Sequence, residues 1–88
     1  MSKALLIPDA VNLDENAAEV IRAWVASGQL HVSIAAGLWQ DPAAWGIVLV
    51  DLARHVARSY EVAANISYEQ ALTRIKAGFV AEWDSSAE

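Results

Sequence analysis

Four ionisable side chains between residues 51 and 58 have types and spacing that suit acid–base chemistry. Asp51, Arg54, His55 and Arg58 share one face if this segment is a helix. In a catalytic interpretation, His55 is a general base oriented by Asp51, and the two arginines hold an anionic substrate. In the competing interpretation, the four residues form a solvated helix face with ion pairs worth roughly 0.2–1 kcal/mol each. We favour the solvated face, because one helix face cannot enclose a substrate and no nucleophile accompanies it.

A second group of polar and aromatic side chains lies on two predicted strands. Strand alternation places Arg22, Trp24, His31 and Ser33 on one sheet face. A tryptophan with polar neighbours is typical of an interaction surface, and we predict one here. The alternative is that the N-terminal segment Met1–Val11 covers this face. A catalytic Ser33–His31 pair is disfavoured, because both side chains leave one flat strand and no acid orients the histidine.

The histidine and cysteine content argues against a metal centre. The chain has no cysteine, which excludes thiolate zinc sites, and its two histidines are His31 and His55. A site built from both histidines needs them on the same side of the molecule, whereas the predicted sheet directs His31 away from the helices. We therefore predict no metal ligand, no cofactor and no catalytic residue.

The segment Trp39-Gln40-Asp41-Pro42-Ala43-Ala44-Trp45-Gly46 combines two tryptophans with a helix start. A helix N-terminus suits an anion, but Asp41 supplies a capping carboxylate that repels one. We therefore expect Trp39 and Trp45 to pack under the hairpin. Gly46 costs roughly 1 kcal/mol relative to alanine inside a helix. We expect it to lie against a neighbouring backbone or an aromatic ring.

The elements that position these residues begin with a β-hairpin. Segments Glu19–Ser27 and Leu30–Ala35 flank Gly28-Gln29, and glycine first in a two-residue loop favours a type II′ turn. This register pairs Ser27 with Leu30, Val25 with Val32, and Ala23 with Ile34. A slip of one residue would mix the apolar and polar faces, so the register is well specified. The apolar face is Ile21, Ala23, Val25, Leu30, Val32 and Ile34, and the opposite face is Arg22, Trp24, Ala26, His31, Ser33 and Ala35.

Two helices follow the hairpin. Asp41 and Pro42 predict a helix from about Pro42 to about Ala64, with Asn65 in the left-handed conformation at its end. Ser67-Tyr68-Glu69-Gln70 has the form of a capping box and begins the second helix. The order ββαα predicts an α+β fold with the helices packed on one sheet face. We assign residues 19–84 to a single domain and residues 85–88 to a tail.

Residues 1–18 lack a sustained hydrophobic period, and we predict an irregular or short extended segment. Leu5-Leu6-Ile7 suits an extended piece that Pro8 ends, and Asp9–Asn16 suits a surface loop. A two-stranded sheet is marginal by itself and leaves two unpaired edges. Either Lys3–Ile7 supplies a third strand, or two hairpins pair edge to edge in a symmetric dimer.

The chain length and the net charge limit which classes of partner we expect. A domain of 88 residues buries only about 60–65% of its unfolded surface, and without disulfides oligomerisation is the usual remedy. The helix over residues 42–64 is also apolar over more than half of its circumference, so we predict a homodimer or a protein partner. The net charge of −5 and the lack of a basic patch argue against nucleic acid and anionic membranes. No apolar run is long enough to span a bilayer and no signal peptide is visible, so we expect a cytoplasmic protein.

Several segments resemble a small family of uncharacterised proteins found mainly in alphaproteobacteria. They are Ala18–Trp24, Leu30–Ile34, the Trp-x-Asp-Pro-x-x-Trp-Gly segment that begins at Trp39, and Leu52-Ala53-Arg54-His55. The family is a domain of unknown function, so the resemblance implies a stand-alone bacterial domain and no activity. Together with the residues, it favours a non-catalytic homodimeric or partner-binding module. The alternative is a small ligand-binding protein or enzyme with a pocket at the subunit interface.

Overall fold

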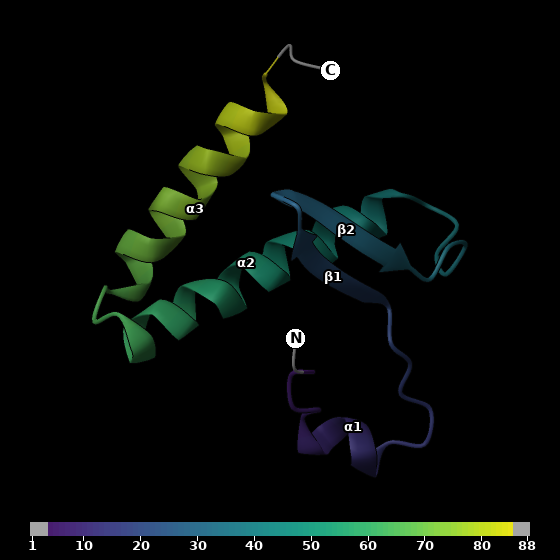
Figure 1. The fold of residues 1–88 in the computed structure, drawn as a ribbon. Helices are drawn as coiled ribbons and strands as arrows, with labels where there is room; N and C mark the ends of the chain where they lie inside the picture. Colours follow the sequence, from purple (N-terminus) through teal and green to yellow (C-terminus); the bar gives the residue numbers. More distant parts are fainter. Residues whose placement is uncertain (1–3, 86–88) are drawn as a thin grey trace. The chain divides into compact units, whose positions relative to one another are not determined.

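A computed structural model describes residues 4–85 (Figure 1). A short helix precedes an antiparallel hairpin, and two longer helices follow it, so the α+β fold with the order ββαα is confirmed. Contacts divide the chain into two units, Met1–Gln40 and Asp41–Glu88, and each is described by itself. The elements are α1 (Asp9–Leu13), β1 (Ile21–Ala26), β2 (Gln29–Ile34), α2 (Ala43–Ala63) and α3 (Tyr68–Trp83).

The hairpin turn differs from the predicted one by one residue. Ser27 and Gly28 form the loop and have φ values of +54° and +73°, the two positive values of a type I′ turn. The predicted Gly28-Gln29 loop and its register are therefore wrong. Gly28 tolerates either turn, so the glycine alone does not decide between them. The observed partners are Ile21 with Ile34, Arg22 with Ser33, Ala23 with Val32, Trp24 with His31, Val25 with Leu30, and Ala26 with Gln29.

The two predicted faces of the hairpin survive this correction. The observed register differs from the predicted one by two residues, and side chains alternate with a period of two. Each residue therefore stays on the face that the sequence assigned to it. Within residues 4–85 the sheet has two strands, so Ala4–Ile7 adds no third strand, and Lys3 lies outside the described residues.

The segment before the hairpin contains a helix where a surface loop was predicted. Pro8 has φ −59° and ψ 145°, and the next five residues, Asp9–Leu13, form α1. The Val11 amide donates to the Pro8 carbonyl at 3.0 Å. The fixed φ of Pro8 is compatible with a helix start, and residues 4–8 form no regular element. The prediction failed because one helical turn is too short to show a hydrophobic period.

The first long helix starts and ends close to the predicted residues. The Asp41 carboxylate accepts a hydrogen bond from the Ala43 amide at 3.0 Å, and Pro42 already has helical angles of −57° and −20°. Asp41 therefore performs the predicted capping from two residues before Ala43, the first residue of the assigned helix. At the other end Asn65 has φ +57°, the left-handed conformation predicted for it. No helix in the described part of the chain is both long enough and apolar enough to cross a membrane.

The second long helix begins at the predicted serine cap. Ser67 has an extended backbone, and its hydroxyl accepts a hydrogen bond from the Gln70 amide at 3.1 Å. This is the first half of a capping box. The Tyr68 amide donates instead to the Glu61 carboxylate of α2 at 3.1 Å. One free amide of the first turn is thus satisfied within α3 and another by the preceding helix.

The contact between α2 and α3 holds the only fully buried side chains among residues 4–85. They are Ala57 of α2 and Ala71 of α3, which are 0% and 5% exposed. Tyr68, Leu72 and Ile75 of α3 are half-buried. Small side chains let two helix backbones approach closely, but they remove little apolar area from water. The helical unit therefore has a narrow contact rather than a wide core.

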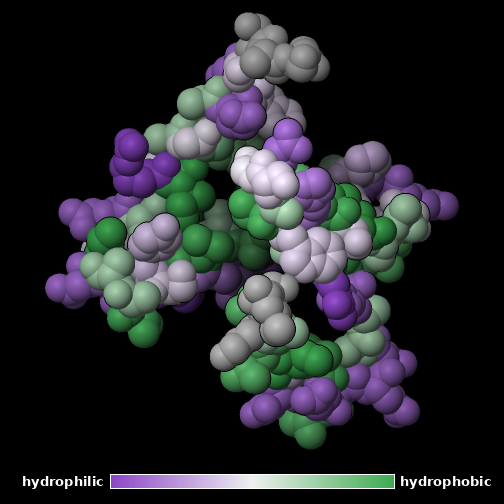
Figure 2. Space-filling model, in the orientation of Figure 1, coloured by the Kyte–Doolittle hydropathy of each residue, from purple (hydrophilic) through white to green (hydrophobic). Residues whose placement is uncertain are grey.

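The unit Met1–Gln40 has no buried side chain in its described part. On the apolar face of the hairpin, Val25 is 78% exposed and Leu30 is 69% exposed. Figure 2 shows hydrophobic residues at the surface of both units, including the region of α1 and the sides of the helices. The exposure of large apolar side chains to water is the main physical feature of this chain. Exposed apolar surface of this kind is typical of sites that bind another protein.

Candidate interaction site

The four residues of the predicted interaction surface lie side by side on the hairpin. Trp24 lies opposite His31, and Arg22 lies opposite Ser33, two residues further along the antiparallel ladder. All four therefore occupy one face, as strand alternation predicted. The Trp24 side chain is 43% exposed. A half-covered tryptophan beside polar groups gives this face both apolar area and hydrogen-bonding capacity.

An ion pair fixes the arginine at the open end of the hairpin. The Arg22 Nε donates to the Glu19 carboxylate at 2.5 Å, and both side chains are exposed. This hydrogen bond, together with the charge of Glu19, raises the pKa of Arg22. A shallow hollow of about 220 Å³ lies here, lined by Glu19, Val20, Ile21, Arg22, Ser33 and Ala35. The guanidinium is already neutralised by Glu19, so this end of the face presents a paired charge.

The histidine of this face is tied to its own hairpin. The His31 Nε2 lies 3.2 Å from the carbonyl oxygen of Ala26, which is in the facing strand. In the neutral tautomer that carries its proton on Nε2, the ring donates to this carbonyl oxygen, and Nδ1 is the acceptor. The contact joins His31 to the facing strand of the hairpin.

The polar group on α2 is only partly brought together. The Arg54 Nη1 lies 4.0 Å from the Asp51 carboxylate, the long limit of an ion pair, and both side chains are exposed. Arg58 does not join this pair, because its guanidinium lies over the Tyr68 ring at 4.7 Å from the ring centre. His55 is exposed. The face thus contains one weak ion pair and one cation–π contact to α3.

The described residues place few potential metal ligands close together. No group of three His, Cys, Asp or Glu side chains between residues 4 and 85 is arranged to hold a metal ion. His31 belongs to the first unit and His55 to the second.

The glycine of the tryptophan-rich helix start has an open environment. A Cβ atom built on Gly46 would meet no other atom within 4 Å. Within its own unit, Gly46 therefore lies against neither a neighbouring backbone nor an aromatic ring, contrary to the prediction, and a contact with the first unit stays a prediction. Sequence shows that glycine costs helix stability, but it does not show what the surrounding space contains. Trp39 and Trp45 belong to different units, so their packing under the hairpin stays a prediction.

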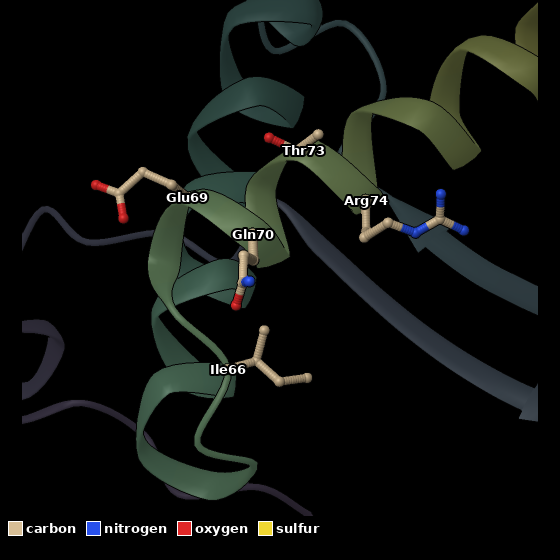
Figure 3. A pocket seen from close by; sticks show the side chains of 5 residues that line it. All are labelled: Ile66, Glu69, Gln70, Thr73 and Arg74. Atoms are coloured by element: carbon tan, nitrogen blue, oxygen red, sulfur yellow. The ribbon is translucent and has the colours of Figure 1, made fainter.

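A hollow beside the start of α3 was not predicted. It has a volume of about 470 Å³ and is lined by Ile66, Glu69, Gln70, Thr73 and Arg74. Figure 3 shows the charged ends of Glu69 and Arg74 extending in different directions from α3. Groups that diverge cannot grip one ligand from several sides. The sequence signal would have been the i, i+1, i+4 and i+5 spacing on α3, which by itself indicates only a polar helix side.

A comparison with protein-family models shows to which family this chain belongs. A model described as a domain of unknown function, DUF5076, matches residues 4–87. The chain belongs to the DUF5076 family. This match covers the hairpin and all three helices, so DUF5076 corresponds to the whole described chain rather than to a part of it.

A solved structure similar to this DUF5076 chain comes from the photosynthetic bacterium Rhodopseudomonas palustrus CGA009. It is 38% identical, covers 100% of this chain and 90% of its own, and superposes with a TM-score of 0.74. Its description is "putative pyruvate dehydrogenase". A comparison with curated proteins gives no match.

Proposed function

We propose that this DUF5076 chain is a non-catalytic association module that acts as a cytoplasmic homodimer and presents its hairpin to a protein partner. The observation that carries the proposal is the burial pattern. Among residues 4–85 only two alanines are fully buried, whereas large apolar side chains are exposed in every element. The cysteine-free composition suits a reducing compartment.

The exposed area supports association. The chain exposes 8111 Å². A compact monomer of 9.5 kDa exposes about 5000 Å², which is about 3000 Å² less. Contacts between the two units and contacts with a second copy are the two ways to bury this difference. A standard protein interface buries about 800 Å² on each partner, so the surplus leaves room for a full-sized interface.

The polar residues support a binding role over catalysis. Arg22 is paired with Glu19, His31 contacts a backbone carbonyl, and Arg58 lies over Tyr68. Each group thus already has a partner that stabilises the fold. Catalytic groups instead need to converge on one reacting atom.

The description of the similar structure suggests a competing role in pyruvate oxidation. That reaction uses a cofactor such as thiamine diphosphate to stabilise a carbanion. The described residues offer no observation that favours this chemistry for the present chain. An assay of pyruvate oxidation with added thiamine diphosphate, Mg²⁺ and ferricyanide as the electron acceptor tests it directly, and turnover that depends on this protein would overturn the non-catalytic proposal.

Sedimentation equilibrium at micromolar concentrations tests the homodimer. We expect a dimer at tens of micromolar, and a monomer throughout that range would refute the proposal.

Trp24→Ala should weaken self-association or partner binding roughly tenfold or more, because a large aromatic side chain loses its buried area. His31→Gln is the matched control on the same face, and because glutamine keeps a polar, hydrogen-bonding side chain at this position, it should change the dissociation constant much less than Trp24→Ala. Equal dissociation constants for wild type and Trp24→Ala would remove Trp24 from the association surface.

A further inference from the structure

We propose that the dimer forms along the free edge of β2, where two copies pair antiparallel about a twofold axis at Val32. The result is a four-stranded sheet with the strand order β1-β2-β2-β1. This inference rests on the proposed homodimer and goes further, because it names the surface and the register.

The hydrogen-bond pattern of the hairpin shows which backbone groups are available. The Ala35 amide donates to the Val20 carbonyl at 3.0 Å, so these two residues form a hydrogen-bonded pair. Such pairs alternate along an antiparallel ladder, which makes Trp24 and His31 a hydrogen-bonded pair as well. The residues of the alternate, non-hydrogen-bonded pairs direct their backbone amide and carbonyl groups away from the facing strand, toward the open edges of the sheet. On β2 these residues are Leu30, Val32 and Ile34.

The outward edge of β2 has no backbone partner in the described part of the chain. Between residues 4 and 85, no hydrogen bond joins it to another element, and the sheet ends at this strand. The side chains beside it are open as well, with Val32 44% exposed. An unpaired edge of this kind is a template for another strand. A two-stranded sheet gains stability when further strands are added.

Charge favours the edge of β2 over that of β1. β1 carries Arg22, and Glu19 lies shortly before it and pairs with it. β2, with the sequence Gln-Leu-His-Val-Ser-Ile, contains no lysine, arginine, aspartate or glutamate. Charged side chains are the usual protection of a sheet edge against pairing. β1 has this protection and β2 does not.

Two registers about a twofold axis each pair five of the six residues of β2, one with the axis at His31 and one with the axis at Val32. With the axis at Val32, the two valines face each other and Leu30 faces Ile34 of the second copy, so all three contacts are apolar. On the opposite face His31 lies beside the second copy's Ser33, a histidine beside a hydroxyl with no like charges opposed. An axis at His31 would instead oppose two imidazoles and leave Ile34 without a partner residue. Both registers bring outward-directed backbone groups together, and the side chains favour the axis at Val32.

Disulfide formation at the axis tests this inference. The chain has no cysteine, so Val32→Cys introduces a single thiol. Facing residues of a hydrogen-bonded pair have Cα atoms about 5.5 Å apart, within the usual disulfide range. We expect most of the Val32→Cys protein to become a covalent dimer under mild oxidation. Ala23→Cys is the matched control, because Ala23 faces Val32 across the hairpin and lies on the other edge. It should stay mainly non-covalent.

The outcomes separate this inference from the proposed homodimer. A covalent dimer from Ala23→Cys instead of Val32→Cys would move the interface to β1 and overturn the inference. A sedimenting dimer that neither cysteine links would also overturn it, while the homodimer itself would stand. A monomer in all experiments would refute both.

A charge at the axis gives a second test that needs no oxidation. Val32→Lys places two ammonium groups opposite each other, and we expect the dissociation constant to rise at least about tenfold. Ala23→Lys carries the same charge on the same face away from the axis, and we expect a much smaller change. Circular dichroism of both variants verifies that the hairpin and helices are retained. Equal effects of the two lysines would contradict pairing at β2.

Discussion

At the scale of single residues, Gly46 offers a direct gain in stability. It lies inside α2, and a Cβ atom added to it would meet nothing within 4 Å. Gly46→Ala should therefore raise the free energy of unfolding by up to about 1 kcal/mol, measured by urea denaturation. Gly28→Ala is the contrasting control, because Gly28 has φ +73° and alanine is strained there, so stability should fall. A loss of stability in Gly46→Ala would mean that another chain approaches α2 at this residue.

Predictions of which face a residue occupies succeeded, whereas predictions of what a residue contacts did not, and the difference has a physical reason. The face shared by Trp24 and His31 depends only on strand alternation, which local sequence determines, and the structure places both on it. The contacts of Gly46 depend on distant parts of the chain. The four polar residues of α2 do not form one cluster for the same reason. Arg58 contacts Tyr68, a residue of another helix, which the spacing within α2 does not predict. Local spacing predicts which residues share a face, but not what each of them contacts.

At the scale of elements, the start of α3 depends on one hydroxyl. Ser67 accepts a hydrogen bond from the Gln70 amide at 3.1 Å. Ser67→Ala should lower the free energy of unfolding by about 1 kcal/mol, because an amide of the first turn loses its partner. Ser59→Ala is the matched control: the Ser59 hydroxyl donates to the Val56 carbonyl within α2, where alanine is the better helix former. Thermal unfolding of both variants compares them, and an equal loss would show that capping is not the cause.

Element order, the strand faces and the helix ends were predictable, because their signals are local. Asp41 and Ser67 act as caps, and Asn65 takes the left-handed conformation. The turn was displaced because Gly28 fits either of two adjacent two-residue loops, and only pairing along the strands decides between them.

At the scale of the whole molecule, an association-dependent fold should depend on concentration. If folding and dimerisation are coupled, each tenfold dilution removes about 1.4 kcal/mol from the stability of the dimer. For two chains of 88 residues this lowers the thermal midpoint by roughly 3–6 °C. Circular dichroism from one to one hundred micromolar measures the shift. A midpoint that is independent of concentration would show that one copy folds without a second.

The attachment of α3 at its first turns has a consequence for how the helical unit opens. Tyr68 contacts both Glu61 and Arg58 of α2, and Ala71 is buried close behind it. Towards the other end, Phe79 and Trp83 stack on each other at 5.7 Å and are exposed. Local opening in a single copy therefore starts at Trp83 and runs back towards Ala71, because the free energy of fraying is lowest where the fewest contacts are lost. The first turn of α3 is thus its anchor on α2, and we expect amide hydrogen exchange to be fastest in the half of the helix that ends at Trp83.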